Sequence, residues 1–389
     1  MPCHRLGWLS NERTAHRISA SAWLETGTRI RPSSGMPAAA LHVGSFWRRY
    51  SVFIIGIDPH KGSHHAAVLN GNEVVIDELG VQADRTQRDR LLAFGEGCEP
   101  HIWAVEGANG TGALLAQQLV AAGEVVLDIP PKLSARVRLL DTECADKSDS
   151  HDARSAAIVA LRHPRLRVVG PEDHTAVLRL LAKRHHDLIA LRTQAICRLH
   201  ALLCALVAGG LPPRLSAARA ARELRRIRPT DAAGTQRRQI AVQLLGEVRR
   251  LDAELFALKT RISDAVTAAD TTVTDLHGVG AIVAAYLIGY TGNIARFPSA
   301  GHYARYNATA PIEASSGPRP RHRLNPKGNR MLNHAVHMAA VTQIANDTDG
   351  RAYYLRKQRE GKTKKEAMRA LKRRISDAVY RQLVSDADR

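Results

Sequence analysis

The segment Ser51-Val-Phe-Ile-Ile-Gly-Ile-Asp58 is a short apolar run that ends on a carboxylate. A bounded apolar run rich in isoleucine and valine is typical of a strand buried within a sheet. The segment Ile102-Trp-Ala-Val-Glu106 follows the same pattern and also ends on an acid. The two segments therefore predict two buried strands, each with a carboxylate at its end.

Strand-like and helix-like patterns alternate around these two segments. Gly71-Asn72 supplies turn chemistry that favours a hairpin, and Pro130-Pro131 is expected to break the chain. The predicted strands are 52–57, 65–69, 73–79, 102–106 and 124–129, and the predicted helices are 85–95, 112–122 and 148–161. Three strands followed by helix, strand, helix, strand and helix is the order of a ribonuclease-H-like domain with a mixed sheet. We place this α/β domain at residues 51–165.

Residues 175–265 are predicted to be helical, with two helices marked by apolar residues three or four apart and the first of them ended by Gly209-Gly210-Leu-Pro-Pro213. The first carries Leu188, Leu191, Ala195, Leu199, Leu202 and Leu206, and the second carries Leu244, Val248, Leu251, Leu255, Leu258 and Ile262. The second spacing is a heptad seam, which favours a helical coiled-coil hairpin able to dimerise. The alternative is an amphipathic helix that packs within its own chain. The arginine-rich stretch 214–228 is either a solvated helix face or a surface that follows phosphates.

Residues 270–389 form a predicted third region, a mainly helical C-terminal domain. Leu276-His-Gly-Val-Gly280 opens an apolar helix and resembles a helix-hairpin-helix element. In such an element the backbone around Gly278 and Gly280 offers N–H groups to a phosphate, although Gly-x-Gly also serves as an ordinary turn. The tail from 356 to 381 is predicted to be mostly basic helix, broken near Gly361, and either solvated or in contact with nucleic acid.

The chain of 389 residues has a formal net charge of +19 and a pI near 10.3. This charge favours a nucleic acid as partner, the alternative being a generally basic proteome. No apolar run approaches the ~18–20 residues of a membrane-spanning helix. Five cysteines without a Cys-x-x-Cys pair favour a reducing, intracellular setting.

Residues 1–50 show no sustained helix or strand period and are expected to be disordered. A start codon assigned too far upstream explains this segment better than a transit peptide does.

Two further acids occur in Lys147-Ser-Asp-Ser-His-Asp-Ala153. Asp149 and Asp152 are three residues apart and share one face of a helix. Four carboxylates close together repel one another, and two Mg²⁺ ions would relieve this because hard cations take oxygen ligands. The alternative is structural, because a single aspartate at a strand end is more often a cap than a metal ligand. Three neighbouring acids, Asp141, Glu143 and Asp146, are further candidates for metal ligands. His60, His64 and His65 are expected to line or flank the site.

These residues carry a resemblance to a known family. Gly56-Ile-Asp-Pro-His-Lys61, Trp103-Ala-Val-Glu-Gly107 and Lys147–Ala153 resemble the DEDD-type insertion-sequence transposases, which include Piv-related DNA invertases and bridge-RNA-guided recombinases. The N-terminal domain of this family is similar to RuvC, the Holliday-junction resolvase. Pro311-Ile-Glu-Ala-Ser-Ser-Gly317 and the basic residues after it resemble the second domain of the family, so the resemblance extends from about residue 52 onward.

The resemblance implies a set of site residues. Asp58, Glu106, Asp149 and Asp152 would be the four catalytic, metal-binding acids, and Ser316 would be the nucleophile, with Ser315 as the alternative. From its sequence alone the Ser-Ser-Gly segment would be a flexible turn. The basic residues that follow it suit contacts with phosphates of the cleaved strand; they are Arg319, Arg321, Arg323, Lys327 and Arg330.

The expected function is therefore that of a transposase that excises and inserts its own element by site-specific recombination. The resemblance implies DNA and a noncoding guide RNA as partners, and a homo-oligomer, a dimer or a tetramer. We expect the protein in the cytoplasm of a prokaryote, associated with the nucleoid. The rival functions are a junction-resolving nuclease that uses water as nucleophile, a DNA invertase at a fixed locus, and a non-enzymatic nucleic-acid scaffold.

Overall fold

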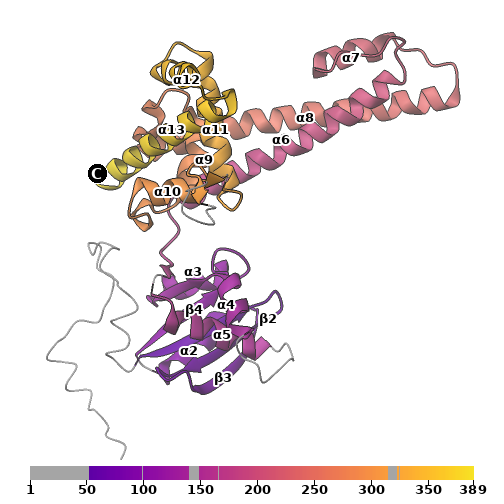
Figure 1. The fold of residues 1–389 in the computed structure, drawn as a ribbon. Helices are drawn as coiled ribbons and strands as arrows, with labels where there is room; N and C mark the ends of the chain where they lie inside the picture. Colours follow the sequence, from indigo (N-terminus) through magenta and orange to yellow (C-terminus); the bar gives the residue numbers. More distant parts are fainter. Residues whose placement is uncertain (1–51, 99, 140–148, 165, 314–321, 324) are drawn as a thin grey trace, which may run out of the picture. The chain divides into compact units, whose positions relative to one another are not determined.

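The computed structural model describes residues 52–98, 100–139, 149–164, 166–313, 322–323 and 325–389. The chain divides into two compact units, Met1–Leu166 and Arg167–Arg389 (Figure 1). The N-terminal extension of residues 1–50 lies outside the described residues, and so do the predicted nucleophiles Ser315 and Ser316.

The first unit is built on a mixed six-stranded sheet with the strand order β3-β2-β1-β4-β5-β6. Its elements are β1 (Phe53–Pro59), β2 (Ser63–Leu69), β3 (Val75–Gln82), α2 (Gln87–Glu96), β4 (His101–Glu106), α3 (Ala113–Ala121), β5 (Val126–Ile129), α4 (Pro131–Arg138) and α5 (Asp149–Arg162). The last strand of the sheet, β6 (Arg167–Val168), follows directly after the boundary at Leu166 and is described here with the sheet. The mixed α/β sheet with helices agrees with the predicted fold class. The five predicted strands and three predicted helices are all present.

Two elements of the sheet unit were not predicted. Pro130-Pro131 does not simply break the chain, because Pro131 is the first residue of α4. Proline suits this position, since the first N–H of a helix has no intrahelical partner. Strand β6 has only two residues, too few for an apolar pattern to reveal it.

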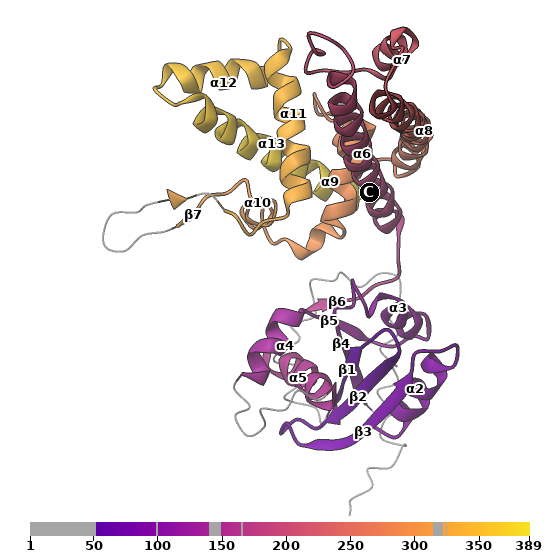
Figure 2. The ribbon, with the colours of Figure 1, turned by 90° about the vertical axis from the view of Figure 1, so that its right-hand side faces the viewer.

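Helices cover both faces of this sheet, with α4 and α5 on one face and α2 and α3 on the other (Figure 2). Helix α5 packs directly on β1 at Gly56, where an added Cβ would lie 2.0 Å from the carbonyl oxygen of Ala153 and 2.8 Å from the amide nitrogen of Ala157. The glycine is therefore required for the close approach of helix and strand. The core between them is aliphatic, with Ile54, Ala153 and Ala157 at most 2% exposed.

The second unit is almost entirely helical. Its elements are α6 (His174–Cys204), α7 (Ala217–Arg226), α8 (Ala232–Ala268), η4 (Thr272–Asp275), α9 (Ala281–Thr291), η5 (Ile294–Arg296), α10 (Ala300–Tyr306), β7 (Ile312–Glu313), β8 (His322–Arg323), α11 (Arg330–Ala345), α12 (Asp349–Arg359) and α13 (Lys364–Ala387). No helix among the described residues is both long enough and apolar enough to cross a membrane.

The long helices α6 and α8 lie side by side in both views, with α7 near the end where their connection runs (Figures 1 and 2). On α8 the predicted seam is buried from Val248 to Ile262. On α6 the predicted apolar face is partly wrong, since Leu191 is 47% exposed while Leu203, which was not predicted, is fully buried. Helix α6 also packs against α9, so its buried face follows two neighbours and not one continuous stripe. Dimerisation through these helices stays a prediction.

Helix α9 is apolar on all sides and packs against α6, α8 and α11. An added Cβ at Gly289 of α9 would lie 2.5 Å from the amide nitrogen of Arg179 in α6, so this glycine sets the close crossing of the two helices. The predicted break at Gly361 is confirmed: its φ of +89° is a left-handed conformation, and it separates α12 from α13.

Candidate active site

Strand register brings the two strand-end acids together. Strands β1 and β4 are parallel neighbours, and Ile57 pairs with Val105. Asp58 and Glu106 are the next residues of the two strands, so they lie beside each other at the same edge of the sheet. Asp58 is 6% exposed. Because side chains alternate along a strand, Asp58 is on the same face as Gly56, the face that α5 covers.

Helix α5 brings the third acid to the same place. Ala153 packs on Gly56, and Asp152 directly precedes Ala153 and is 5% exposed. The carboxylates of Asp58, Asp152 and Glu106 are close enough for the first two to raise the pKa of the third. The structure thus assembles three of the four predicted acids from two strands and one helix.

The fourth acid, Asp149, is the first residue of α5. It lies one helical turn before Asp152, on the same face of the helix. Its side chain lies outside what the structure describes, and the competing acids Asp141, Glu143 and Asp146 lie in a segment that is not described at all.

An arginine that the sequence did not single out completes the cluster. Arg138, the last residue of α4, forms an ion pair with the buried Asp152. The hydrogen bond to Asp152 is the main cause that raises the pKa of Arg138; burial opposes it, and the charges of Glu106 and Asp58 add to it. One guanidinium therefore offsets part of the charge of an acidic cluster drawn from three elements. A lone basic residue at a helix end gave no signal in the sequence.

Glu106 is the least compensated of these acids. Burial is the largest effect that raises its pKa, and repulsion from Asp58 and Asp152 raises it further, while Ser134 and Arg138 act in the opposite direction. Its Oε2 atom is buried and has no hydrogen-bond partner among the described residues. A buried carboxylate oxygen without a donor is costly, and a hard cation would satisfy it.

The chemistry of the site therefore fits divalent metal. Its ligands would all be carboxylate oxygens, the donors that Mg²⁺ prefers. Among the described side chains, no group of three His, Cys, Asp or Glu already has the arrangement of a metal site. Arg138 occupies the position of a counter-charge in this cluster, and the side chain of Asp149 is not among those described.

The three neighbouring histidines separate into two groups. His60 Nε2 lies 3.0 Å from Asp58 Oδ2, and His65 is paired with Asp58 across β1 and β2, so both flank the acids. His64 belongs to the opposite face of the sheet, where its Nε2 lies 2.9 Å from Oε1 of Gln87. The expectation that His64 flanks the site is wrong, because successive strand residues point to opposite faces.

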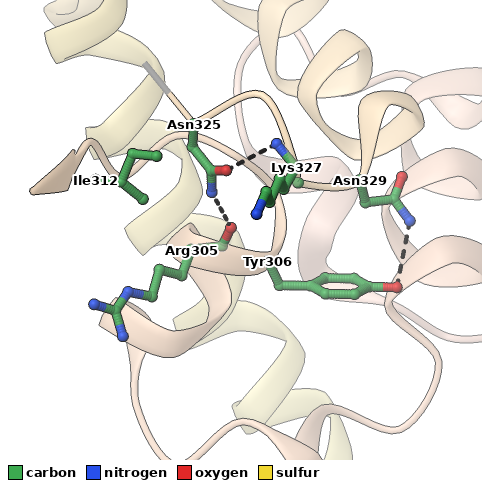
Figure 3. Close-up of a pocket in the computed structure, with 7 residues that line it drawn as sticks. Arg305, Tyr306, Ile312, Asn325, Lys327 and Asn329 are labelled. Atoms are coloured by element: carbon green, nitrogen blue, oxygen red, sulfur yellow. Dashed lines mark hydrogen bonds between the residues drawn. The ribbon is translucent and has the colours of Figure 1, made fainter. Parts of the chain in front are cut away.

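The second unit holds a polar pocket of about 510 Å³ (Figure 3). Arg305, Tyr306, Ile312, Asn325, Lys327, Gly328 and Asn329 line it. Asn325 shapes the wall: its Nδ2 donates to the carbonyl oxygen of Arg305 (2.8 Å), and its Oδ1 accepts from the amide of Lys327 (3.0 Å). Opposite, the amide of Asn329 donates to the carbonyl oxygen of Tyr306 (2.6 Å).

The pocket lies at the base of a two-stranded ribbon. Ile312 of β7 lines it and pairs with Arg323 of β8. Residues 314–321, which connect the two strands and include Ser315, Ser316, Arg319 and Arg321, lie outside the described residues, as does the side chain of Arg323. Lys327 and Arg330 are exposed near this pocket, Lys327 in its wall and Arg330 at the start of α11.

A cation also lies beneath the pocket. The Arg296 guanidinium is 4.4 Å from the ring centroid of Tyr306. Burial is the largest effect on the Tyr306 hydroxyl and would raise its pKa, but Arg296, Asn329 and Arg179 together lower it. The positive charge that lowers the pKa of the Tyr306 hydroxyl would also favour a bound phosphate, so the pocket has the electrostatic character of a surface for phosphates.

Gly278 and Gly280, whose backbone N–H groups are predicted to bind a phosphate, differ in their surroundings. Gly278 has a φ of +84°, and an added Cβ would be 2.8 Å from the carbonyl oxygen of Ala339, so this glycine is pressed against α11. Gly280 precedes α9 as its N-cap residue and has open space around it. Of the two, Gly280 is exposed and Gly278 is partly covered, and their binding of phosphate stays a prediction.

Comparison with known proteins agrees with this two-part organisation. A family model for DEDD transposases of the IS110 type, described as a transposase, matches residues 55–207, and one described as "Transposase IS116/IS110/IS902 family" matches residues 270–355. The 42 kDa protein of insertion element IS900 from Mycobacterium paratuberculosis is 28% identical over 84% of this chain and 94% of its own length.

Two Streptomyces proteins show the same relation. The 44.8 kDa protein of insertion element IS116 from Streptomyces clavuligerus is 27% identical over 86% of this chain and 95% of its own length. The 43.6 kDa protein of insertion element IS110 from Streptomyces coelicolor is 29% identical over 66% of this chain and 65% of its own. Together with the two family models and the acid cluster, these relatives show that the chain belongs to the IS110 family of DEDD transposases, which are DNA recombinases.

Proposed function

We propose that this transposase excises and inserts its element through Mg²⁺-dependent cleavage and a covalent serine–DNA intermediate, guided by a noncoding bridge RNA. The observation that carries the proposal is the convergence of Asp58, Glu106 and Asp152 around Arg138. A buried cluster of three acids has no structural benefit that offsets its repulsion, and the family to which the chain belongs is one of DNA transposases.

Asp58, Glu106, Asp149 and Asp152 would hold two Mg²⁺ ions. Bound there, the ions would polarise the phosphodiester and ease loss of a proton from the attacking hydroxyl. Arg138 must leave Asp152 for all carboxylate oxygens to become ligands, because a guanidinium uses the same oxygens. The arginine thus keeps the acids together in the metal-free protein and competes with the cations for them.

Ser316 is the proposed nucleophile, with Ser315 as the alternative. Its Oγ would form a bond to the phosphorus while the bond from phosphorus to the 3′ oxygen breaks. The serine proton passes to a base of the site, and the leaving 3′ oxygen takes up a proton. The phosphoserine keeps the energy of the broken linkage, so a second 3′-hydroxyl can reverse the step on a new strand without ATP. The acids and the serine lie in different units, so the active site would be composite and complete only in an oligomer.

The polar pocket would hold a phosphate beside the serine. Arg305 and Lys327 line it, and Arg330 follows at the first turn of α11. A helix N-terminus and cationic side chains both favour a phosphate. Arg319, Arg321 and Arg323 would extend this surface along the cleaved strand, and Gly280 would add backbone N–H groups. A basic surface with few aromatic residues, only 4% of the chain, suits the backbones of duplex DNA and of a guide RNA better than base stacking.

Trapping of a protein–DNA adduct tests the serine. The full chain is incubated with element-end DNA, guide RNA and Mg²⁺, and the adduct is measured after denaturation. We expect wild type and the exposed control Ser385→Ala to form it, Ser316→Ala to form none, and Ser315→Ala to retain it. An adduct that survives in Ser316→Ala but not in Ser315→Ala moves the nucleophile to Ser315, and one that survives in both contradicts the serine mechanism.

The rival with most support is a nuclease that uses water, since the acid cluster is built within one unit. It predicts nicking that depends on Asp58 and Glu106 and is equal in wild type and Ser316→Ala. A scaffold without catalysis predicts no effect of Asp58→Ala on DNA, and an invertase predicts inversion at one locus with no excised element. Deep sequencing of DNA junctions formed in cells separates these outcomes.

A further inference from the structure

A second group of basic side chains lies where α11 and α13 pack against each other. His334 and His337 are three residues apart on α11, and Arg369 and Lys372 are three apart on α13, so each pair shares a helix face. Burial is the largest effect that lowers the pKa of the His337 imidazole, followed by Lys372 and then His334, so Lys372 of α13 lies close to His337 of α11. None of these four residues is part of the acid cluster or the polar pocket.

Lys372 is the unusual member of this group. It is half-buried, and its Nζ donates to Asn333 Oδ1 at 2.7 Å. Among the described residues it has no other hydrogen-bond partner and no carboxylate within ion-pair distance. Asp377, on the same helix, is paired with Arg373 at 3.1 Å, and Glu366 caps the helix start. Burial, followed by repulsion from Arg369, lowers the pKa of Lys372 to about 8.

This lysine rests on a rigid polar network. Asn333 Nδ2 donates to the carbonyl oxygen of Asn307 at 2.9 Å, and Asn307 Nδ2 donates to Ser376 Oγ at 2.7 Å. Asn307 and Ser376 are both 0% exposed. The neighbouring Ala308 leaves no room for a side chain at Gly328, which lines the polar pocket. This group of basic side chains is therefore held in a fixed relation to that pocket.

We propose that Lys372, Arg369, His334 and His337 form a further anion site, which binds a backbone phosphate of the DNA on which this transposase acts. An ammonium has three donors, and Lys372 uses one of them on Asn333. A phosphate oxygen would take the others, and the half-buried cation would gain the counter-charge that the described residues do not supply. The hydrogen bonds through Asn333, Asn307 and Ser376 would hold this phosphate at a constant distance from a second phosphate bound in the polar pocket.

The opposing interpretation is that Lys372 only ties α13 to α11 through Asn333. The two interpretations predict opposite signs for stability. If Lys372 serves to bind a ligand, it destabilises the free protein, because it is half-buried without a counter-charge. Lys372→Met should then raise the melting temperature by about 2–4 °C. A lysine kept as a structural tie should stabilise the protein, and the same change should lower the melting temperature.

The test measures DNA affinity as a function of salt in the absence of divalent metal, so that it does not depend on Ser316 or on catalysis. Variants of the full chain are Lys372→Met and the control Arg381→Met, an exposed residue of the same helix. We expect Lys372→Met to reduce the slope of log affinity against log salt by about 0.9 for duplex DNA. Arg381→Met should leave the slope at the wild-type value.

Three results would overturn the proposal. They are an unchanged slope in Lys372→Met, an equal change in both variants, and a change with single-stranded RNA but none with DNA. The adduct experiment can fail while this one succeeds, because binding without metal needs neither the acids nor the serine.

Discussion

The acid cluster of the sheet unit and the cationic surfaces of the helical unit handle charge in opposite ways. Asp58 and Asp152 are at most 6% exposed, and each has a basic partner within its own unit, His60 for Asp58 and Arg138 for Asp152. Lys327 and Arg330 are exposed, and Lys372 has no acidic partner among the described residues. In the acid cluster, metal ions could replace the Arg138 guanidinium. The exposed or acid-free cations of the helical unit could instead bind a phosphate from outside the protein. This difference suits the proposed function, in which the first unit holds metal ions and the second contacts phosphates.

The largest effect should come from removing one acid. Asp58→Asn keeps the size of the side chain but removes a carboxylate of the site, and we expect DNA strand cleavage to fall at least about a thousandfold, the scale of losing a catalytic group. Adduct yield in single-turnover reactions measures it. Asp77→Asn, at an exposed position of β3, is the matched control and should cleave normally. Cleavage by Asp58→Asn within tenfold of wild type would remove the acid cluster from the mechanism.

The close contact between α5 and β1 should be the next most sensitive feature. Gly56→Ala places a methyl group against the backbone of Ala153, and we expect it to lower the free energy of unfolding by about 1–3 kcal/mol and to displace Asp152. Thermal unfolding and adduct yield should both fall. Gly71→Ala is the control, since nothing lies within 4 Å of an added Cβ there. Equal stability of the two variants would contradict the packing argument.

Arg138→Gln tests the internal balance of the acid cluster. Without the guanidinium, the carboxylates should bind Mn²⁺ about tenfold more tightly, because one competing charge is gone. The metal-free variant should melt below wild type, and saturating Mg²⁺ should restore it. Electron paramagnetic resonance of free Mn²⁺ measures affinity, and Arg136→Gln, an exposed neighbour on α4, controls for net charge. Weaker Mn²⁺ binding in Arg138→Gln would mean that the arginine supports the metal and does not compete with it.

The smallest effect is the pH dependence of stability that Lys372 contributes. Its pKa falls from the ordinary 10.5 to about 8 on folding, so the unfolded chain binds the proton more tightly. The lysine therefore destabilises the fold fully below about pH 8, and this penalty disappears as the pH rises to 10.5. The melting temperature of Lys372→Met should exceed that of wild type at neutral pH, and the difference should vanish in alkaline buffer. A difference that is constant across this range would contradict the shifted pKa.

Much of the sheet unit could be predicted from the sequence because its signals are local. Apolar runs of strand length, Gly71-Asn72 between two of them, and acids at the ends of the segments at Asp58 and Glu106 all lie within a few neighbours. In the helical unit, Leu191 was wrongly placed on the apolar face of α6. A helix with two packing partners does not follow one stripe, and periodicity alone cannot show which partner each turn meets.

The sequence by itself determined the types of the main helices and strands, though not α4 or β6, and it determined the break at Gly361 and the residue types of the site. The tertiary structure alone decided that Arg138 pairs with Asp152, that His64 points away from the acids, and that Lys372 is half-buried beside Asn333. These facts depend on which strands are neighbours and which helix lies across them. Burial and Coulomb interactions act through space, so groups far apart in the chain change one another's charge only after the fold has brought them together.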